Sequence, residues 1–223
     1  MDIPNLIQTV LIYALPVIFA ITVHEAAHGY AARYFGDDTA YLMGRMTLNP
    51  IRHIDPIGTI LMPLMLYFAT SGAFLFGYAK PVPVNFGMLR NPKRHMMWVA
   101  LAGPGSNFVM AVGWALLLVA LVALGIDETF FIKMAQGGVL VNLVMWAFNL
   151  FPLPPLDGGR VLAGLLPSGG AQTFLARIEP FGFFIVMGLV IAGIVSTYWL
   201  VPLMGLGYSA IRLLISPFTA LLG

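Results

Sequence analysis

The chain has 223 residues, of which 60% are hydrophobic and only 9% are charged, and its mean hydropathy is +0.91. Since soluble domains carry about 25% charged residues, this composition excludes an ordinary soluble protein and predicts an integral membrane protein. The net charge of +2 is too small to indicate a nucleic-acid partner, and the absence of cysteine excludes disulfides and thiolate metal ligands. We find no internal repeat or long linker, so residues 1–223 are expected to form a single membrane domain.

The first predicted helix runs from about Pro4 to Tyr34, because Pro4 suits a first helical turn and residues 36–38, Gly-Asp-Asp, are typical of a helix end. The helix carries no charged residue from Ile3 to Val23. That length, about twenty residues, is sufficient to cross a membrane.

The second half of this helix contains the segment His24-Glu25-Ala26-Ala27-His28. Two histidines four residues apart on a helix lie on one face, one turn apart, and can share a tetrahedral metal ion. A glutamate next to the first histidine can act as general base toward water at the metal. Ionisable groups at the end of an apolar span are costly in lipid, so they indicate a functional site. The alternative, a soluble core helix with a buried histidine pair, fits the composition poorly.

Residues 37–55 are more polar than the segments on either side and carry Arg45, Arg52 and Asp55. We expect this segment to lie at the membrane interface. His53 in the same segment is interpreted as a residue at headgroup level rather than a metal ligand. Residues 56–79 are again uncharged, and the sequence leaves open whether they re-enter the membrane or cross it twice.

Residues 77–85, GYAKPVPVN, cannot form a regular helix, because Pro81 and Pro83 favour extended backbone. Extended backbone at membrane depth is tolerated only when it is buried in protein or lines a watery cavity. We therefore expect a small re-entrant or interfacial β element, a strand or hairpin, beside the active site. An exposed strand edge can hold an unfolded peptide by main-chain hydrogen bonds.

The next helix is expected from about Met96 to Ile126 and contains AGPGSN at residues 102–107. The glycines of this segment are interpreted as helix-packing residues. Asn107 is a candidate polar neighbour of the active site.

A further helix is expected from about Met134 to Phe151, ending in NLFPLPPLDGGR at residues 149–160. Its three prolines break the helix, so Asp157 is expected on non-helical backbone. An ionisable residue in an irregular, otherwise apolar segment is a candidate metal ligand. An Asp-Gly turn at the membrane surface is the alternative reading.

The C-terminal part begins with residues 161–179, which are expected at the interface, and continues with about thirty uncharged residues from Phe181 to Ile211. Whether these form one long helix or two is left open. The predicted fold is an all-α polytopic membrane protein with about 5–6 membrane helices.

The distribution of basic residues predicts the orientation in the membrane. If the N-terminus lies outside and residues 56–79 re-enter or cross twice, most basic residues face the cytoplasm. Nine of the 11 lysines and arginines do so: Arg33, Arg45, Arg52, Lys80, Arg90, Lys93, Arg94, Arg160 and Arg177. Lys133 lies outside, and Arg212 is undecided. We expect a multi-pass protein of the cell membrane with its active site toward the cytoplasmic side.

A catalytic zinc needs three protein ligands and an open position. His24, His28 and Asp157 supply two nitrogens and one oxygen, so we expect one Zn²⁺ per chain at these residues. Zinc lowers the pKa of a bound water to about 7, and Glu25 could take its proton before attack on a peptide carbonyl. Asn149 is the candidate for an amide that contacts the substrate.

These residues resemble the site-2 protease family of intramembrane zinc metalloproteases. The resemblance lies in four segments that follow the order of the family: HEAAH at 24–28, GYAKPVPVN at 77–85, AGPGSN at 102–107 and NLFPLPPLDGGR at 149–160. The chain is most similar to the short prokaryotic subgroup, because no PDZ domain fits between the predicted helices and no CBS domain follows them.

The resemblance implies zinc held by His24, His28 and Asp157, with Glu25 as the base. It also implies substrate contacts from Asn149 and from the predicted strand, for which we expect Gly77, Tyr78, Ala79, Pro81 and Val82. Members of the family cleave transmembrane segments of membrane-bound regulators, often after a first cut by another protease. The expected partners are therefore transmembrane-segment protein substrates within the lipid bilayer, and the oligomeric state is left open.

Two other classes of protein were weighed. A ZIP-like divalent metal transporter would need further histidine and aspartate ligands on neighbouring helices, and the sequence offers almost none. A catalytically silent membrane scaffold derived from a protease would usually have lost the glutamate or a ligand, whereas this chain keeps all four groups.

Overall fold

The computed structural model describes residues 3–62, 65, 77–167 and 169–220. Its elements are helices of α, 3-10 and π type, and the described residues contain no β strand. In chain order they are α1 (Ile3–Tyr34), α2 (Thr39–Leu42), η1 (Pro50–His53), η2 (Pro56–Leu61), η3 (Phe86–Met88), α4 (Pro92–Ala123), α5 (Thr129–Asn149), α6 (Asp157–Leu165), α7 (Gly170–Ile191), η4 (Ser196–Leu200) and α8 (Val201–Thr219).

Five helical spans among the described residues are long and apolar enough to cross a membrane: Ile7–Tyr34, Pro92–Ala123, Thr129–Asn149, Gly170–Ile191 and Ser196–Thr219. Many large apolar side chains on these helices are exposed, as expected of a surface that faces lipid rather than water. The protein is thus a multi-pass, all-helical membrane protein, and this part of the predicted fold is confirmed.

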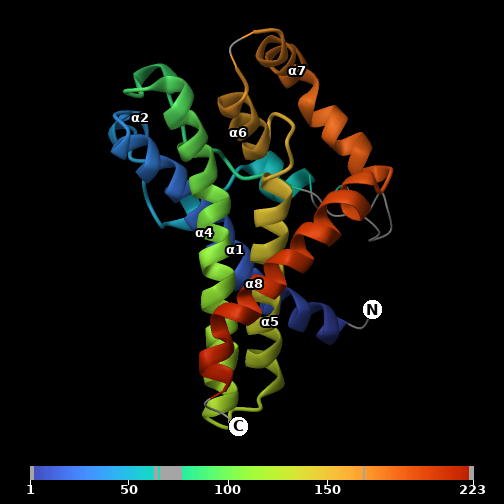
Figure 1. Ribbon diagram of the computed structural model, residues 1–223. Coiled ribbons are helices and arrows are strands. Elements are labelled where there is room, and N and C mark those ends of the chain that lie inside the picture. The colour runs from blue at the N-terminus through green and yellow to red at the C-terminus, as the bar shows by residue number, and fades with distance from the viewer. Residues whose placement is uncertain (1–2, 63–64, 66–76, 168, 221–223) are drawn as a thin grey trace.

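The centre of the molecule is a bundle in which α1, α4 and α5 pack pairwise against one another (Figure 1). α8 packs against α4 and α5 and completes an apolar core. The fully buried members of this core are small or branched residues: Ala111, Ala115, Val139, Leu143 and Ile211. Small residues allow the helices to approach closely where the hydrophobic effect of water is absent.

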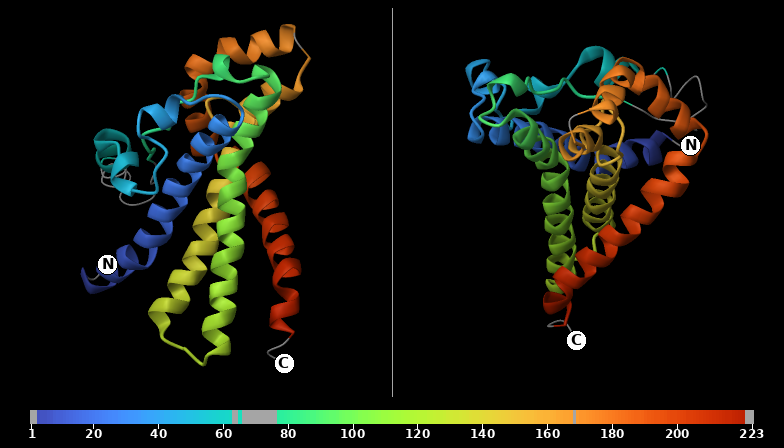
Figure 2. Two further views of the ribbon diagram at one scale, coloured as in Figure 1. Left: turned by 90° about the vertical axis from the view of Figure 1, so that its left-hand side faces the viewer. Right: turned by 45° about the horizontal axis from the view of Figure 1, so that its top comes forward.

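Short elements and irregular segments gather at one end of the bundle, opposite the α4–α5 connection (Figure 2). This end holds α2, the extended segment of residues 77–85 and α6, which packs on α4. The C-terminal part of α1 reaches the same end and contacts α2 and η1. The bundle therefore presents its irregular backbone at a single end.

Residues 77–85 are extended, but the predicted strand is not formed. Two backbone bonds tie the segment to its surroundings, from the Tyr78 N–H to the Gly58 carbonyl and from the Lys80 N–H to the His53 carbonyl. Prolines at 81 and 83 have no N–H and cannot continue a ladder. Side chains hold the segment instead, so the extended geometry was predicted correctly and the strand was not.

The chain after Pro92 follows the predicted order of long helices, and it answers one question that the sequence leaves open. The long apolar stretch that begins at Phe181 forms two helices, α7 and α8, and the break between them contains Gly193 with a φ of +73°. That backbone conformation suits glycine and ends α7. The question whether residues 56–79 re-enter or cross twice falls largely outside the described residues.

His53 is buried, with 2% of its surface exposed, and its Nε2 lies 2.8 Å from the carbonyl oxygen of Thr47. Burial within the protein does not define the depth of the side chain in the membrane, so its position at headgroup level stays a prediction. The side chain is a buried part of the packing between α1 and η1, and it is not close to the candidate metal ligands.

Asp37 is a fully buried carboxylate that fixes the chain after α1, with 0% of its surface exposed. One oxygen accepts from the N–H and hydroxyl of Thr39, and the other accepts from the N–H of Asn85 at 2.7 Å. The second bond anchors the end of the extended segment to the end of α1.

We expect Asp37→Ala to lower the free energy of unfolding by about 2 kcal/mol or more, because buried donors lose their acceptor. Denaturant unfolding in detergent measures this change. The matched control is Asp38→Ala, whose side chain is 60% exposed in an ion pair with Arg33; its loss should cost under about 1 kcal/mol. Equal losses in the two variants would contradict the anchoring role of Asp37.

Candidate metal centre

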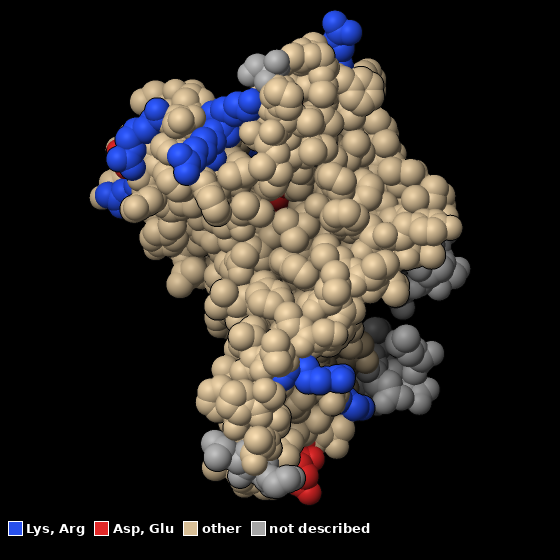
Figure 3. Space-filling view, viewed as in Figure 1, with Lys and Arg blue, Asp and Glu red and all other residues tan. Residues whose placement is uncertain are grey.

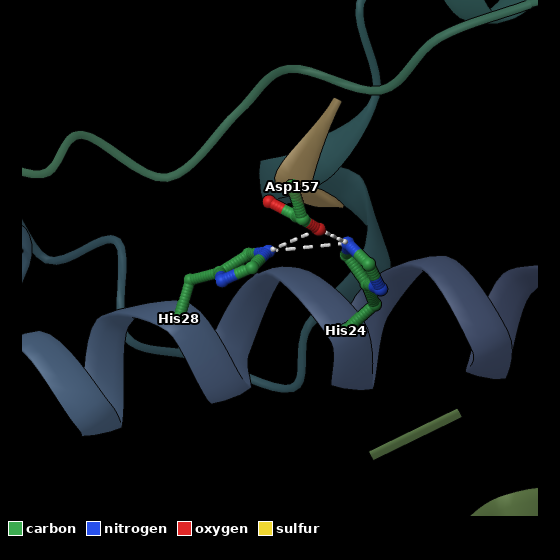
Figure 4. Close-up of side chains that lie close together, drawn as sticks. All are labelled: His24, His28 and Asp157. Carbon is green, nitrogen blue, oxygen red and sulfur yellow. Dashed lines mark hydrogen bonds and ion pairs between the residues drawn. The ribbon is translucent and has the colours of Figure 1, made fainter. Parts of the chain in front are cut away.

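The two histidines of residues 24–28 lie on one face of α1, and Asp157 faces them from the start of α6 (Figure 4). The Nε2 atoms of His24 and His28 are 3.1 Å apart. Oδ2 of Asp157 lies 3.3 Å from each of them. The fold thus brings the three residues singled out as zinc ligands to one point, although α6 follows α1 at a great distance in the sequence.

The positions of these three atoms fit a zinc ion. Ligand atoms about 2.0–2.1 Å from zinc at tetrahedral angles lie about 3.3 Å from one another. Oδ2 of Asp157 is buried and accepts no hydrogen bond within the described part of the chain. A buried carboxylate oxygen without a partner is costly, and a cation among the three atoms would satisfy it. Nitrogen from histidine and oxygen from carboxylate are also ligands that zinc prefers.

The other ring nitrogens indicate which nitrogen of each histidine can bind a metal. Nδ1 of His28 lies 2.7 Å from the carbonyl oxygen of Val99 on α4, which can only accept. Nδ1 of His24 lies 2.6 Å from Oδ1 of Asn107 on the same helix. With both Nδ1 atoms as donors, each Nε2 keeps a lone pair that faces Asp157.

Asn107 is oriented so that its oxygen faces His24. Its Nδ2 donates to the Ala20 carbonyl at 3.2 Å and to Oδ1 of Asn142 at 3.0 Å. Nδ2 of Asn142 in turn donates to the Gly138 carbonyl at 2.9 Å. Both asparagines are 0% exposed. Each amide thus has its oxygen and nitrogen assigned by its neighbours, and the chain of bonds ends with a proton on Nδ1 of His24.

Gly103 on α4 makes room for both imidazole rings. A Cβ at this position would lie 2.7 Å from Cε1 of His24 and would also collide with the ring of His28. The interpretation of this glycine as a helix-packing residue is therefore incomplete, because the absent side chain leaves space for the metal-binding face of α1.

Asp157 is the first residue of α6, so the predicted non-helical backbone at this position is wrong. Gly158 and Gly159 explain how a helix can start directly after the prolines. A Cβ at Gly158 would collide with the Leu150 carbonyl, and one at Gly159 would collide with the backbone of Pro154. The two glycines let α6 pack directly on the preceding loop, which directs Asp157 toward α1.

Glu25 lies beside the candidate ligands and contacts the extended segment. Its Oε2 accepts a hydrogen bond from the Val82 N–H at 2.7 Å. The buried side chain of Arg45 donates from Nη2 to the carbonyls of Lys80 at 3.0 Å and Pro81 at 3.3 Å. The extended segment is therefore fixed by an arginine on one side and holds the carboxylate of Glu25 on the other.

The candidate ligands and Glu25 line a cavity of about 170 Å³. Three of the six predicted substrate-binding residues also line it: Pro81, Val82 and Asn149. Tyr78 lines a separate cavity, whereas Gly77 and Ala79 line neither of the two. Figure 3 shows an acidic side chain in a recess whose immediate surroundings carry no charged side chain.

Sequence reasoning missed Asn142 and Arg160. Asn142 is an amide in the middle of a mostly apolar helix, and a polar residue inside a membrane span was a signal that could have been used. Arg160 lines the cavity, and its guanidinium carbon lies 4.8 Å from the centroid of the Phe86 ring. Its basic charge indicated only an interfacial position, so the sequence contained no signal for this contact.

Comparison with known proteins found relatives that match along most of the chain. The chain is 38% identical over 212 residues to a Bacillus subtilis protein named "Putative zinc metalloprotease YwhC", which covers 91% of this chain and 90% of the relative. It is 30% identical over 199 residues to a Mycobacterium tuberculosis protein named "Putative zinc metalloprotease Rip2", covering 86% of this chain and 73% of the relative. No family model and no solved structure matches.

We expect Gly103→Ala to displace the imidazole rings and weaken zinc binding at least about tenfold, which chelator competition would measure. Gly105→Ala is the matched control on the same helix, because a Cβ there meets no atom within 4 Å. Wild-type zinc affinity in both variants would show that the space at Gly103 is not required by the histidines.

Asn142→Leu should also weaken zinc binding, by about 10–100-fold, because Asn107 loses an acceptor that fixes its orientation. A flipped Asn107 amide would donate to Nδ1 of His24 and move the proton of the ring to Nε2. Asn107→Asp in the Asn142→Leu background should restore zinc affinity, since a carboxylate can only accept from Nδ1.

The control for this series is Gln136→Leu, which removes an exposed amide from the same helix. It should retain wild-type zinc affinity. A loss in Asn142→Leu that Asn107→Asp does not reverse would indicate a packing defect rather than a fixed tautomer.

Proposed function

Because the chain belongs to the site-2 protease family of zinc metalloproteases, we propose that it hydrolyses peptide bonds within or near transmembrane segments of membrane proteins. The observation that carries the proposal is the group of His24, His28 and Asp157, with Glu25 beside it, at one end of a membrane-spanning bundle. The biological setting that we propose is regulated intramembrane proteolysis.

His24, His28 and Asp157 would hold one Zn²⁺ per chain through two nitrogens and one oxygen. Bound there, zinc supplies Lewis-acid chemistry to peptide hydrolysis. The lone pairs on both Nε2 atoms and the unpartnered Oδ2 support this ligand set. Asn107 and the Val99 carbonyl hold the two rings in the required tautomer.

Glu25 is the proposed general base. Within the described residues, the bond from the Val82 N–H occupies only Oε2, so Oε1 can take a proton from the attacking water. The same bond holds the carboxylate in place beside the candidate ligands. After the attack, the protonated Glu25 can pass its proton to the leaving amine, which closes the cycle.

Pro81, Val82 and Asn149 are proposed to contact the substrate, because they form walls of the cavity that contains the metal ligands. A peptide bond inside an intact helix is not accessible to attack, so the substrate must unwind locally. An unwound peptide beside residues 77–85 would lie against backbone that is already extended.

The active site is proposed to face the cytoplasm. Basic residues lie at the same end of the bundle as the candidate ligands: Arg45 contacts the extended segment and Arg90 contacts the end of α1. Figure 3 shows lysine and arginine side chains gathered over this end, with a smaller group toward the opposite end. Basic residues are in excess on the cytoplasmic side of membrane proteins.

A metal transporter is not favoured by any observation. Transport requires several sites in succession, and residues 3–62, 65, 77–167 and 169–220 contain one group of histidine and acidic side chains that could bind a metal. A silent scaffold is equally unsupported, because the candidate base and all three candidate ligands are present together.

The proposal is tested by zinc content and cleavage measured on the same samples. Wild type and Glu25→Gln, purified in detergent, should each contain one zinc per chain. Wild type should cut members of a panel of single-span membrane peptides, and Glu25→Gln should cut them at least about 100-fold more slowly, because the base is lost. Glu128→Gln, at an exposed position before α5, is the control and should behave as wild type.

Asp157→Ala tests the third ligand in the same assay. It should lose zinc together with activity, whereas Glu25→Gln loses activity alone. Wild-type zinc content in Asp157→Ala would exclude the proposed ligand set, and full cleavage by Glu25→Gln would exclude the proposed base. If wild type contains zinc but cuts no peptide of the panel, the proposed protease function is contradicted. Zinc flux into liposomes would then be measured.

A further inference from the structure

A second cavity of about 210 Å³ lies between α5, α7 and the loop before α6. Its lining is almost entirely apolar and aromatic: Tyr78, Phe148, Pro155, Leu156, Phe183, Val186, Met187 and Val190. The described residues that line it include a buried one, Val186, with 5% of its surface exposed. The cavity therefore has a buried floor at Val186, and partly exposed side chains surround it.

The backbone of α7 lies against the loop before α6 at Gly182, at one edge of the cavity wall. A Cβ at Gly182 would collide with the Pro154 carbonyl, so the backbone of α7 lies directly on the loop there. The larger side chains of residues 183–190 follow on the next two turns and form the wall that faces α5. Gly182 sets the distance of that wall from the loop.

The apolar cavity adjoins the cavity of the metal centre. Pro155 lines both. Phe148 directly precedes Asn149 at the end of α5, and Leu156 directly precedes Asp157 at the start of α6, so adjacent residues at both ends of the α5–α6 connection face the two cavities. Tyr78 belongs to the extended segment whose Pro81 and Val82 line the metal cavity. A peptide that lies across the metal centre therefore has this apolar cavity within the reach of a nearby side chain.

We propose that the cavity is a subsite that binds one large apolar side chain of the substrate, such as leucine or phenylalanine, close to the bond that is cut. The inference rests on the proposed protease function and adds a specificity to it. The cavity is smaller than the roughly 300–1,000 Å³ of pockets that bind whole small molecules, so a single side chain is the matching occupant. Pro155 lines both cavities, and this shared wall places the apolar cavity next to the metal cavity, unlike an isolated lipid groove.

A position-scanned set of single-span peptides, reconstituted with wild-type protein in vesicles, tests the subsite. Each peptide differs from the parent by one residue near the cut: leucine, phenylalanine, alanine or tryptophan. Wild type should prefer leucine or phenylalanine over alanine by at least about tenfold in kcat/KM at one position, because a hydrophobic pocket discriminates by about 10–200-fold per methylene group.

Val186→Phe fills the cavity and should reverse this preference toward alanine while the zinc content stays at one per chain. Ile185→Phe is the matched control, because this adjacent side chain of α7 is 38% exposed and does not line the cavity. It should keep the wild-type preference. Met187→Ala enlarges the cavity and should admit tryptophan, so the test does not depend on the folding of Val186→Phe.

The outcomes separate the subsite from the proposed function. A wild type that cuts no peptide overturns the protease function itself. If wild type cuts the peptides and both Val186→Phe and Met187→Ala keep its side-chain preference, the subsite alone is overturned. Val186→Phe could instead lower kcat/KM equally for all peptides in vesicles and leave it unchanged in detergent. That result would assign the cavity to a lipid chain and would also overturn the subsite.

Discussion

The arrangement of the helices depends above all on three acceptor atoms that face one another inside the protein. The Nε2 atoms of His24 and His28 and Oδ2 of Asp157 converge within 3.1–3.3 Å, and no donor of the described residues satisfies Oδ2. In a medium of low dielectric constant, such an arrangement is unfavourable unless a cation lies among the atoms. The geometry of these three residues therefore fits the surroundings of a metal ion.

Four helices supply the candidate ligands and the hydrogen bonds that orient them. α1 carries both histidines and Glu25, α4 supplies the Val99 carbonyl and Asn107, and α5 supplies Asn142. α6 supplies the carboxylate. Any shift of α4 relative to α1 would break the two hydrogen bonds that orient the imidazoles, so the packing of the bundle and the chemistry of the ligands depend on the same contacts.

The sequence was sufficient to predict the long membrane helices and the residues that meet. Apolar runs have a length that the membrane dictates, and two histidines four apart share a helix face whatever surrounds them. Proline predicted the extended geometry of residues 77–85, but the absence of a strand depends on partners that only the folded chain provides. The roles of Gly103 and Asn142 depend on which helix packs beside α1, and periodicity in one segment cannot reveal that.

Asp157 lies on α6, after α1, α4 and α5 in the chain. Since proteins are made from the N-terminus, α1 is synthesised with both histidines and Glu25 long before its third partner exists. A nascent chain that ends before residue 157 therefore has the proposed base but not the full set of candidate ligands. The order of elements along the chain delays the completed centre until the helices that enclose it have already been made.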